Sequence, residues 1–128
     1  MSGITTRDLR IIFAFAIQVA KADRSVALHE EEILDLIAEA GGLSGGDRAE
    51  LADERPPVER SSDLSSAEAK ALLVKTLCAV AFADNVRHDA EMDLIIRVNA
   101  HLGDVVALRP WEEWEAYVED VVDTLASL

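Results

Sequence analysis

One pattern occurs twice in this chain, and it restricts the fold more than any other feature of the sequence. The motif Ala-x-Ala-Asp ends at Asp23 and again at Asp84, and a glutamate follows each aspartate seven residues later, as Glu30 and Glu91. The two copies are 61 residues apart, without a gap between the matched positions. A repeat of this kind in a small chain indicates two similar structural units that bury their apolar faces against each other.

Each copy of the repeat predicts a helical hairpin. A long apolar stretch is followed by a short turn that contains the aspartate and then by a shorter amphipathic stretch. Apolar residues recur at the i, i+3, i+4 spacing of a helix face in these stretches. A glycine ends the second stretch of each copy, at Gly42 and at Gly103, as is usual after a helix C-terminus. We therefore expect hairpins over about residues 5–42 and 65–103.

Both hairpins begin with residues that suit a helix N-terminus. Thr5 or Thr6 can cap the first helix, and Thr5 with Asp8 resembles a capping box, in which a hydroxyl and an acidic side chain each bond a backbone amide. Ser65 with Glu68 matches the same pattern more closely.

The remaining segments are a connection and a further helix. The connection, about residues 43–64, is rich in Gly and Pro, and its stretch Asp47–Glu54 can form a short helix. Pro110 suits the first turn of a closing C-terminal helix over about 110–127. The sequence thus predicts a single all-α domain over residues 1–128, a duplicated helical-hairpin bundle with a closing C-terminal helix.

The charge of the chain restricts its partners. Twelve Lys and Arg against 25 Asp and Glu give a net charge of −13. This charge disfavours nucleic acids and anionic membranes, which bind clustered Lys and Arg, and it favours cations and basic protein surfaces. The apolar stretches are shorter than the roughly 18–20 residues of a membrane-spanning helix, and no signal-peptide pattern opens the chain. We therefore expect a cytoplasmic protein without direct membrane insertion.

Asp23, Glu30, Asp84 and Glu91 are candidate metal ligands. Each aspartate lies where an apolar helix is expected to end, and each glutamate lies in the first turn of the next helix. If a pseudo-two-fold axis relates the hairpins, the four carboxylates approach one another, and such hard oxygen ligands suit Ca²⁺, Mg²⁺ or Mn²⁺. The alternative is local: the aspartates bond turn amides, and the glutamates interact with the helix dipole.

The two motifs resemble those of the TerB-like family of tellurite-resistance proteins. The family turn usually reads Ala-Asp-Gly before an apolar residue and a glutamate, whereas Arg24 and Asn85 stand at the glycine positions here. The resemblance covers about residues 5–103. It implies an all-helical fold with a duplicated unit, and a divalent-cation site formed by the four matching acidic residues. It also implies a non-enzymatic role in tellurite or chemical-stress resistance, with other proteins as partners, including membrane-associated complexes.

Arg24 leads to a second interpretation of the same residues. Its guanidinium can lie among the four carboxylates and take the place of a metal ion. The protein is then a metal-free acidic protein–protein interaction module. Paired carboxylates also permit acid–base chemistry, but no second catalytic residue type accompanies them, and no enzymatic activity is predicted.

Two further features concern the core. Trp111 and Trp114 lie on one side of the last helix, and residues 111–128 contain six acids and no Lys or Arg. We expect this stripe to pack on the hairpins, and the alternative is a partner groove or a homodimer contact, since Trp is enriched at interfaces. Cys78 lies in an apolar run and is predicted to be a small core residue rather than a nucleophile.

Overall fold

The computed structural model describes residues 3–21, 28–83 and 89–128, without the side chains of residues 28–30. The described residues form helices and no strand, which confirms the all-α prediction for this part of the chain. In chain order the elements are α1 (Thr6–Lys21), α2 (Leu28–Gly41), α3 (Gly45–Glu54), the 3₁₀ helix η1 (Val58–Asp63), α4 (Ala67–Ala83), α5 (Asp89–His101), the 3₁₀ helix η2 (Trp111–Glu113) and α6 (Glu115–Ala126).

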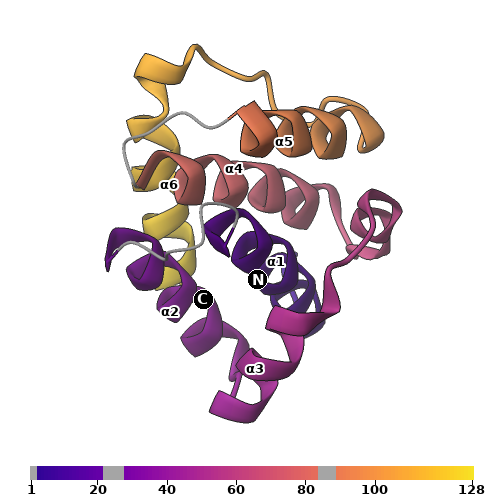
Figure 1. Cartoon of the computed structure of the whole chain (residues 1–128), viewed down its shortest axis with the longest axis vertical. Coiled ribbons are helices and arrows are strands. Elements are labelled where there is room, and N and C mark those ends of the chain that lie inside the picture. The colour runs from indigo at the N-terminus through magenta and orange to yellow at the C-terminus, as the bar shows by residue number, and fades with distance from the viewer. Residues whose placement is uncertain (1–2, 22–27, 84–88) are drawn as a thin grey trace.

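Helices α1 and α4 form the centre of the molecule. They pack against each other, α2 and α3 cover α1, α5 covers α4, and α6 lies against α4 and α2 (Figure 1). Most residues of α1 and α4 are buried. Helix α4 is apolar on nearly all sides, whereas α1 keeps one polar face with Arg7, Gln18 and Lys21. None of the helices in the described ranges is both long enough and apolar enough to span a membrane.

The capping box predicted at the start of α1 is confirmed. The backbone amide of Thr5 donates to Oδ2 of Asp8 at 2.8 Å, and the amide of Asp8 donates to Oγ1 of Thr5 at 3.1 Å. At the start of α4 the prediction is wrong by one residue. Ser66, rather than Ser65, accepts a hydrogen bond on its Oγ from the amide of Ala69, at 3.1 Å.

Ser65 donates hydrogen bonds to the carboxylate of Asp8, which caps α1. Its amide donates to Oδ1 of Asp8 at 2.9 Å and its hydroxyl donates to Oδ2 at 2.6 Å. Asp8 is only 1% exposed, so these bonds compensate the burial of its charge. Glu68 likewise bonds outside its own helix and accepts from the amide of Gly3 at 2.9 Å. The N-termini of α1 and α4 are thus tied together by long-range hydrogen bonds.

The 61-residue offset of the sequence repeat recurs in the helix boundaries. Adding 61 to the bounds of α1 and α2 gives residues 67–82 and 89–102, within one residue of α4 and α5. The C-terminal caps follow the same offset. Gly42 and Gly103 have φ of +64° and +83°, and the next amide donates to the carbonyl of Ala38 in one case and of Asn99 in the other, both at 2.8 Å. Both helices therefore end in the same glycine-dependent turn.

Replacing either of these glycines with alanine is expected to cost about 1 kcal/mol of unfolding free energy, because alanine is strained at positive φ. A Cβ at Gly42 or Gly103 meets no atom within 4 Å, so the whole cost is conformational. Gly45→Ala is the matched control, since that position is equally open but has no positive φ. Urea denaturation should show similar losses for Gly42→Ala and Gly103→Ala, and no loss for Gly45→Ala; a loss common to all three would contradict the shared turn.

The predicted connection, residues 43–64 between α2 and α4, packs on the core. The short helix predicted within it is present as α3, which begins with a reciprocal capping box at Ser44. Leu51 of α3 is buried in the core, and the side-chain amide of Gln18 donates to the carbonyl of Ala52 at 2.9 Å. The segment therefore contributes to the packing around α1 as well as joining α2 to α4.

Cys78 and Trp114 lie in the core, as predicted, and Trp111 packs against its edge. Trp114 is 1% exposed, and its ring Nε1 donates to the carbonyl of Arg109 at 2.7 Å. Trp111 is half-buried between Phe82 and Trp114, with ring centroids about 5 Å away. Cys78 is fully buried, and burial raises the pKa of its thiol to about 12, so the thiolate nucleophile is not formed at neutral pH.

Candidate functional site

Only part of the predicted metal site belongs to the described residues. Asp23 and Asp84 lie outside them, as does the side chain of Glu30, whose backbone is in the first turn of α2. Glu91 is described: it lies in the first turn of α5 as predicted, and its side chain is buried, 2% exposed. Within the described ranges, no three His, Cys, Asp or Glu side chains form a group that could hold a metal ion. The four-carboxylate site remains a prediction.

The described neighbours of the two motifs meet at one cavity. Glu32, two residues after Glu30, lines a cavity of about 480 Å³. Ala83, directly before Asp84, lines the same cavity from the C-terminal end of α4. The fold thus brings the beginning of α2, in the first unit, next to the end of α4, in the second unit.

This cavity is one part of a groove between α2 and α6, which we call the α2–α6 groove. A second part, of about 450 Å³, lies farther along the same two helices, and Leu36 lines both parts. Early residues of α2 face early residues of α6, and late residues face late ones, so the two helices run in the same direction along the groove. Apolar side chains form its floor: Ile33, Leu36 and Ala40 of α2, Phe82 and Ala83 of α4, and Val118, Val122, Leu125 and Ala126 of α6.

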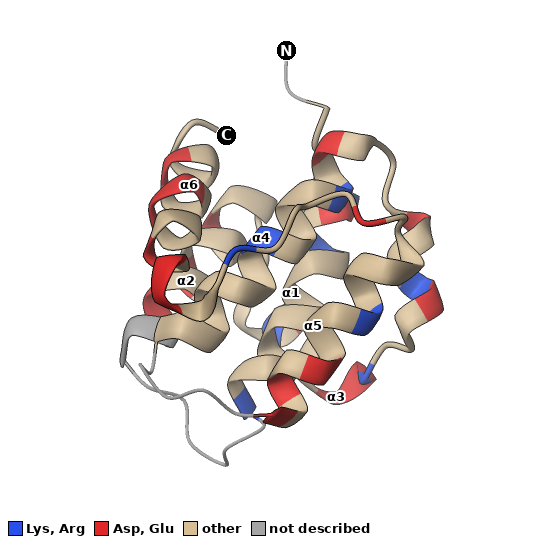
Figure 2. Ribbon diagram, turned by 90° about the horizontal axis from the view of Figure 1, so that it is seen from above, with Lys and Arg blue, Asp and Glu red and all other residues tan. Residues whose placement is uncertain are grey.

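Acidic side chains border this apolar floor. Helix α2 contains five Asp and Glu residues, α6 contains four, and neither contains Lys or Arg. Figure 2 shows the acidic positions along α6 with no basic position among them. Glu32 and Glu39 line the groove from α2, and Glu115 lines it from α6. The groove therefore combines an apolar floor with negative edges.

Two basic residues of neighbouring helices pair with acids of α2 and α6. Arg48 of α3 contacts Asp35 of α2 at 2.7 Å, and Lys75 of α4 contacts Asp120 of α6 at 2.7 Å. Neither Arg48 nor Lys75 lines the groove. The acid-rich stretch 111–128 was evident in the sequence, but the approach of α2 to α6 depends on tertiary packing and was not predicted.

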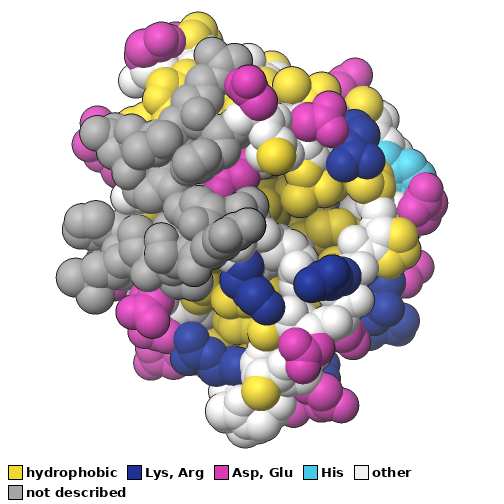
Figure 3. Space-filling view, viewed as in Figure 1, with side chains coloured by type: hydrophobic (Ala, Val, Ile, Leu, Met, Phe, Trp, Pro, Cys, Tyr) yellow, Lys and Arg dark blue, Asp and Glu magenta, His cyan; other side chains and the backbone are white. Residues whose placement is uncertain are grey.

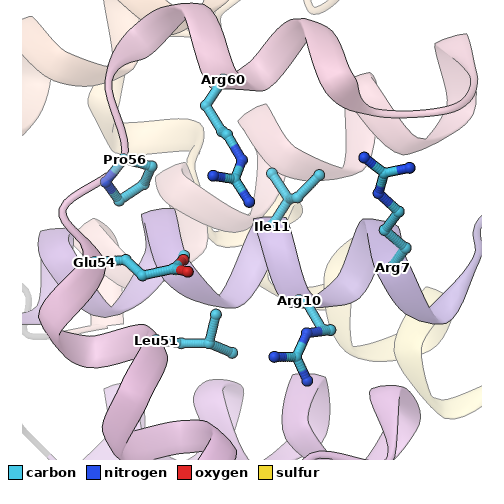
Figure 4. Close-up of a pocket in the computed structure, with 8 residues that line it drawn as sticks. Arg7, Arg10, Ile11, Leu51, Glu54, Pro56 and Arg60 are labelled. Atoms are coloured by element: carbon cyan, nitrogen blue, oxygen red, sulfur yellow. The ribbon is translucent and has the colours of Figure 1, made fainter.

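A smaller pocket of about 180 Å³ has mixed charge. It is lined by Arg7, Arg10, Ile11, Ala14, Leu51, Glu54, Pro56 and Arg60 (Figure 4). The guanidinium groups of Arg7 and Arg10 point away from each other in this view. Arg10 contacts Asp47 and Arg60 contacts Asp63, both at 3.6 Å. The arginines of this pocket therefore do not converge on one anion position.

The face of the molecule shown in Figure 3 also has mixed charge, because basic and acidic side chains alternate there around apolar surface.

Comparisons of the chain with family models, curated proteins and solved structures found no match. The TerB-like resemblance therefore rests on the repeated motif itself.

Proposed function

We propose that this protein is a non-enzymatic, TerB-like module of tellurite or chemical-stress resistance that binds a divalent cation between its two hairpins. Asp23, Glu30, Asp84 and Glu91 would supply the oxygen ligands, which suit Ca²⁺, Mg²⁺ or Mn²⁺. The observation that carries this proposal is the approach of the two chain segments, because Glu32, two residues after Glu30, and Ala83, directly before Asp84, line one cavity.

Two further observations support the proposal. The boundaries of the helices and their glycine caps repeat at the spacing of the acidic motifs, which is expected of two equivalent units. Glu91, the described member of the set, is shielded from bulk water. A divalent cation would reduce the repulsion among carboxylates that approach one another, and would thereby stabilise the folded state.

Thermal denaturation in the presence of CaCl₂, MgCl₂ or MnCl₂ tests the cation site. At millimolar concentration one of these ions is expected to raise the Tm by about 5 °C or more, because a ligand that binds only the folded state stabilises it. Asp84→Asn is expected to lose this rise, whereas Asp53→Asn, which removes an exposed carboxylate on α3, should keep it.

The same variants separate loss of binding from loss of folding. Without cation, Asp84→Asn should melt no lower than the unmodified protein, because it removes one negative charge from a repulsive group. An equal response of the unmodified protein and Asp84→Asn to every cation would rule out the site.

The second candidate function is a metal-free acidic protein–protein interaction module, and the α2–α6 groove is the observation that favours it. In this case Arg24 would replace the cation among the carboxylates. The unmodified protein would then show no cation response, and Arg24→Gln would acquire one. An Arg24→Gln variant that also fails to respond would contradict the replacement.

A further inference from the structure

We infer that the α2–α6 groove binds a basic amphipathic helix of another protein. This inference develops the second candidate function, the acidic interaction module, and names the chemistry of the partner. Its test alters none of the four proposed cation ligands.

The apolar floor of the groove has the form that a helix can occupy. Leu36, Val118 and Val122 are only partly buried, and Leu128 at the far end is 43% exposed. The groove follows α6 from Glu115 to Ala126, a length of about 16 Å at the rise of an α-helix. This length corresponds to about three turns, so apolar residues at i, i+3, i+4 and i+7 of a docked helix can all reach the floor.

The charge of the two walls determines which helix fits. An incoming Lys or Arg beside the floor meets Glu39 of α2 on one side and Glu115 of α6 on the other, and neither helix contains a Lys or Arg that would repel it. Arg48 and Lys75, on neighbouring helices, pair with Asp35 and Asp120. An acidic helix would be repelled on both sides, and burial of apolar surface would have to overcome that repulsion.

The same charge argues against other occupants. A second copy of this chain carries a net charge of −13, so self-association through an acidic groove is opposed by repulsion. Phosphate-bearing surfaces, whether nucleic acid or anionic lipid, are opposed for the same reason. A basic amphipathic helix can bury apolar surface on the floor of the groove and is attracted by the acidic residues at its edges.

The test uses a labelled synthetic peptide of about 16 residues, with leucines at helix-face spacing and lysines at the other positions. Its binding is measured by fluorescence anisotropy. One control peptide has the same composition with the leucines distributed around the helix, and another has glutamate in place of every lysine. The amphipathic lysine peptide is expected to bind at least about 10-fold more tightly than either control.

Two double variants locate the binding site. Glu39→Lys with Glu115→Lys reverses charge at the edges of the groove, whereas Glu50→Lys with Glu59→Lys makes the same change in net charge at exposed positions on α3 and η1. The groove variant is expected to weaken binding by about 10-fold or more, and the control variant by about 2-fold or less. Circular dichroism melting checks that both variants are folded.

Val122→Asp provides an independent test of the apolar floor, because it places a charge on a partly buried position of the groove. It should weaken binding even though it adds negative charge to the protein. If net charge alone governed binding, Val122→Asp would strengthen it, and that result would overturn the inference.

Three other results would also overturn it. In the first, the two double variants weaken binding of the amphipathic lysine peptide equally. In the second, the peptide with distributed leucines binds as tightly as the amphipathic one. In the third, sedimentation shows a dimer that the peptide dissociates, which would identify a second copy of the chain as the occupant. Preference for the glutamate peptide would overturn the inference while leaving an interaction module in place. The cation experiment alters neither Glu39 nor Glu115, so failure of one proposal does not imply failure of the other.

Discussion

Trp114→Ala is expected to lower the free energy of unfolding by about 3–5 kcal/mol, as is typical when a buried large aromatic residue is removed. Trp114 is 1% exposed, and its ring contacts those of Trp111 and Tyr117 at centroid distances of 5.0 and 6.1 Å. The substitution also leaves the carbonyl of Arg109 without the bond from Nε1. Because the variant loses a fluorophore, urea denaturation should be followed by far-ultraviolet circular dichroism.

Two less severe variants separate the contributions to this loss of unfolding free energy. Trp114→Phe keeps most of the ring contacts but removes the Nε1 donor, and it is expected to cost about 1–3 kcal/mol. Trp111→Ala alters a half-buried ring and should cost less than Trp114→Ala. A loss below about 1 kcal/mol for Trp114→Ala would contradict its role in the core and would favour the alternative interface role for the tryptophan stripe.

Asp8→Ala is expected to cost about 2–4 kcal/mol, since it removes a helix cap and leaves the amide and hydroxyl of Ser65 without their acceptor. The bonds from Ser65 join α1 to the segment before α4, so the loss reaches beyond one helix. Ser65→Ala removes one of the donors and should cost less. Chemical denaturation at neutral pH measures both changes, and equal stability of Asp8→Ala and the unmodified protein would exclude this linkage.

The same carboxylate makes stability depend on pH. Burial on its own would raise the pKa of Asp8, but the hydrogen bonds from Ser65 and Thr5 outweigh it and lower the pKa below 3.8. The folded state therefore holds its proton less tightly than the unfolded state does. The resulting stabilisation is complete above the unfolded pKa and is lost as the pH falls below 3.8 through the folded pKa.

Asp8→Asn isolates this contribution, because asparagine does not titrate. The difference in unfolding free energy between the unmodified protein and Asp8→Asn should be constant near neutral pH and should shrink as the pH falls below about 4. Denaturant titrations at several pH values measure this difference. A difference that stays constant down to pH 2 would contradict the lowered pKa.

Comparison of the two helix starts shows where local sequence patterns succeed. The capping box of α1 uses Thr5 and Asp8, which are close in the sequence, and it was predicted correctly. At α4 the pattern Ser65–Glu68 was preferred, but Ser65 donates to Asp8, 57 residues away, and Ser66 caps the helix. The buried carboxylate of Asp8 is stabilised by the two donors of Ser65, and Ser66 can cap α4 in its place. Asp8 and Ser65 come together only when α1 and α4 pack against each other.

The candidate functional residues also include some that were predictable from local sequence and some that depend on tertiary packing. The spacing of Asp23, Glu30, Asp84 and Glu91 can be read from the sequence because it repeats, and Glu91 lies in a first helical turn as predicted. The acid-rich character of residues 111–128 was also evident. That Glu39 and Glu115 border the same groove was not, because α2 and α6 are separated by more than 70 residues of sequence.

The sequence by itself determined the repeat, the helices and their glycine C-caps, because apolar periodicity and the backbone freedom of glycine act over a few neighbouring residues. The tertiary structure decided that Trp114 is fully buried whereas Trp111 is only half-buried, that Ser65 bonds Asp8, and that two acidic helices enclose an apolar groove. These three features depend on which distant surfaces meet when α1 and α4 are covered, and long-range packing decides that outcome.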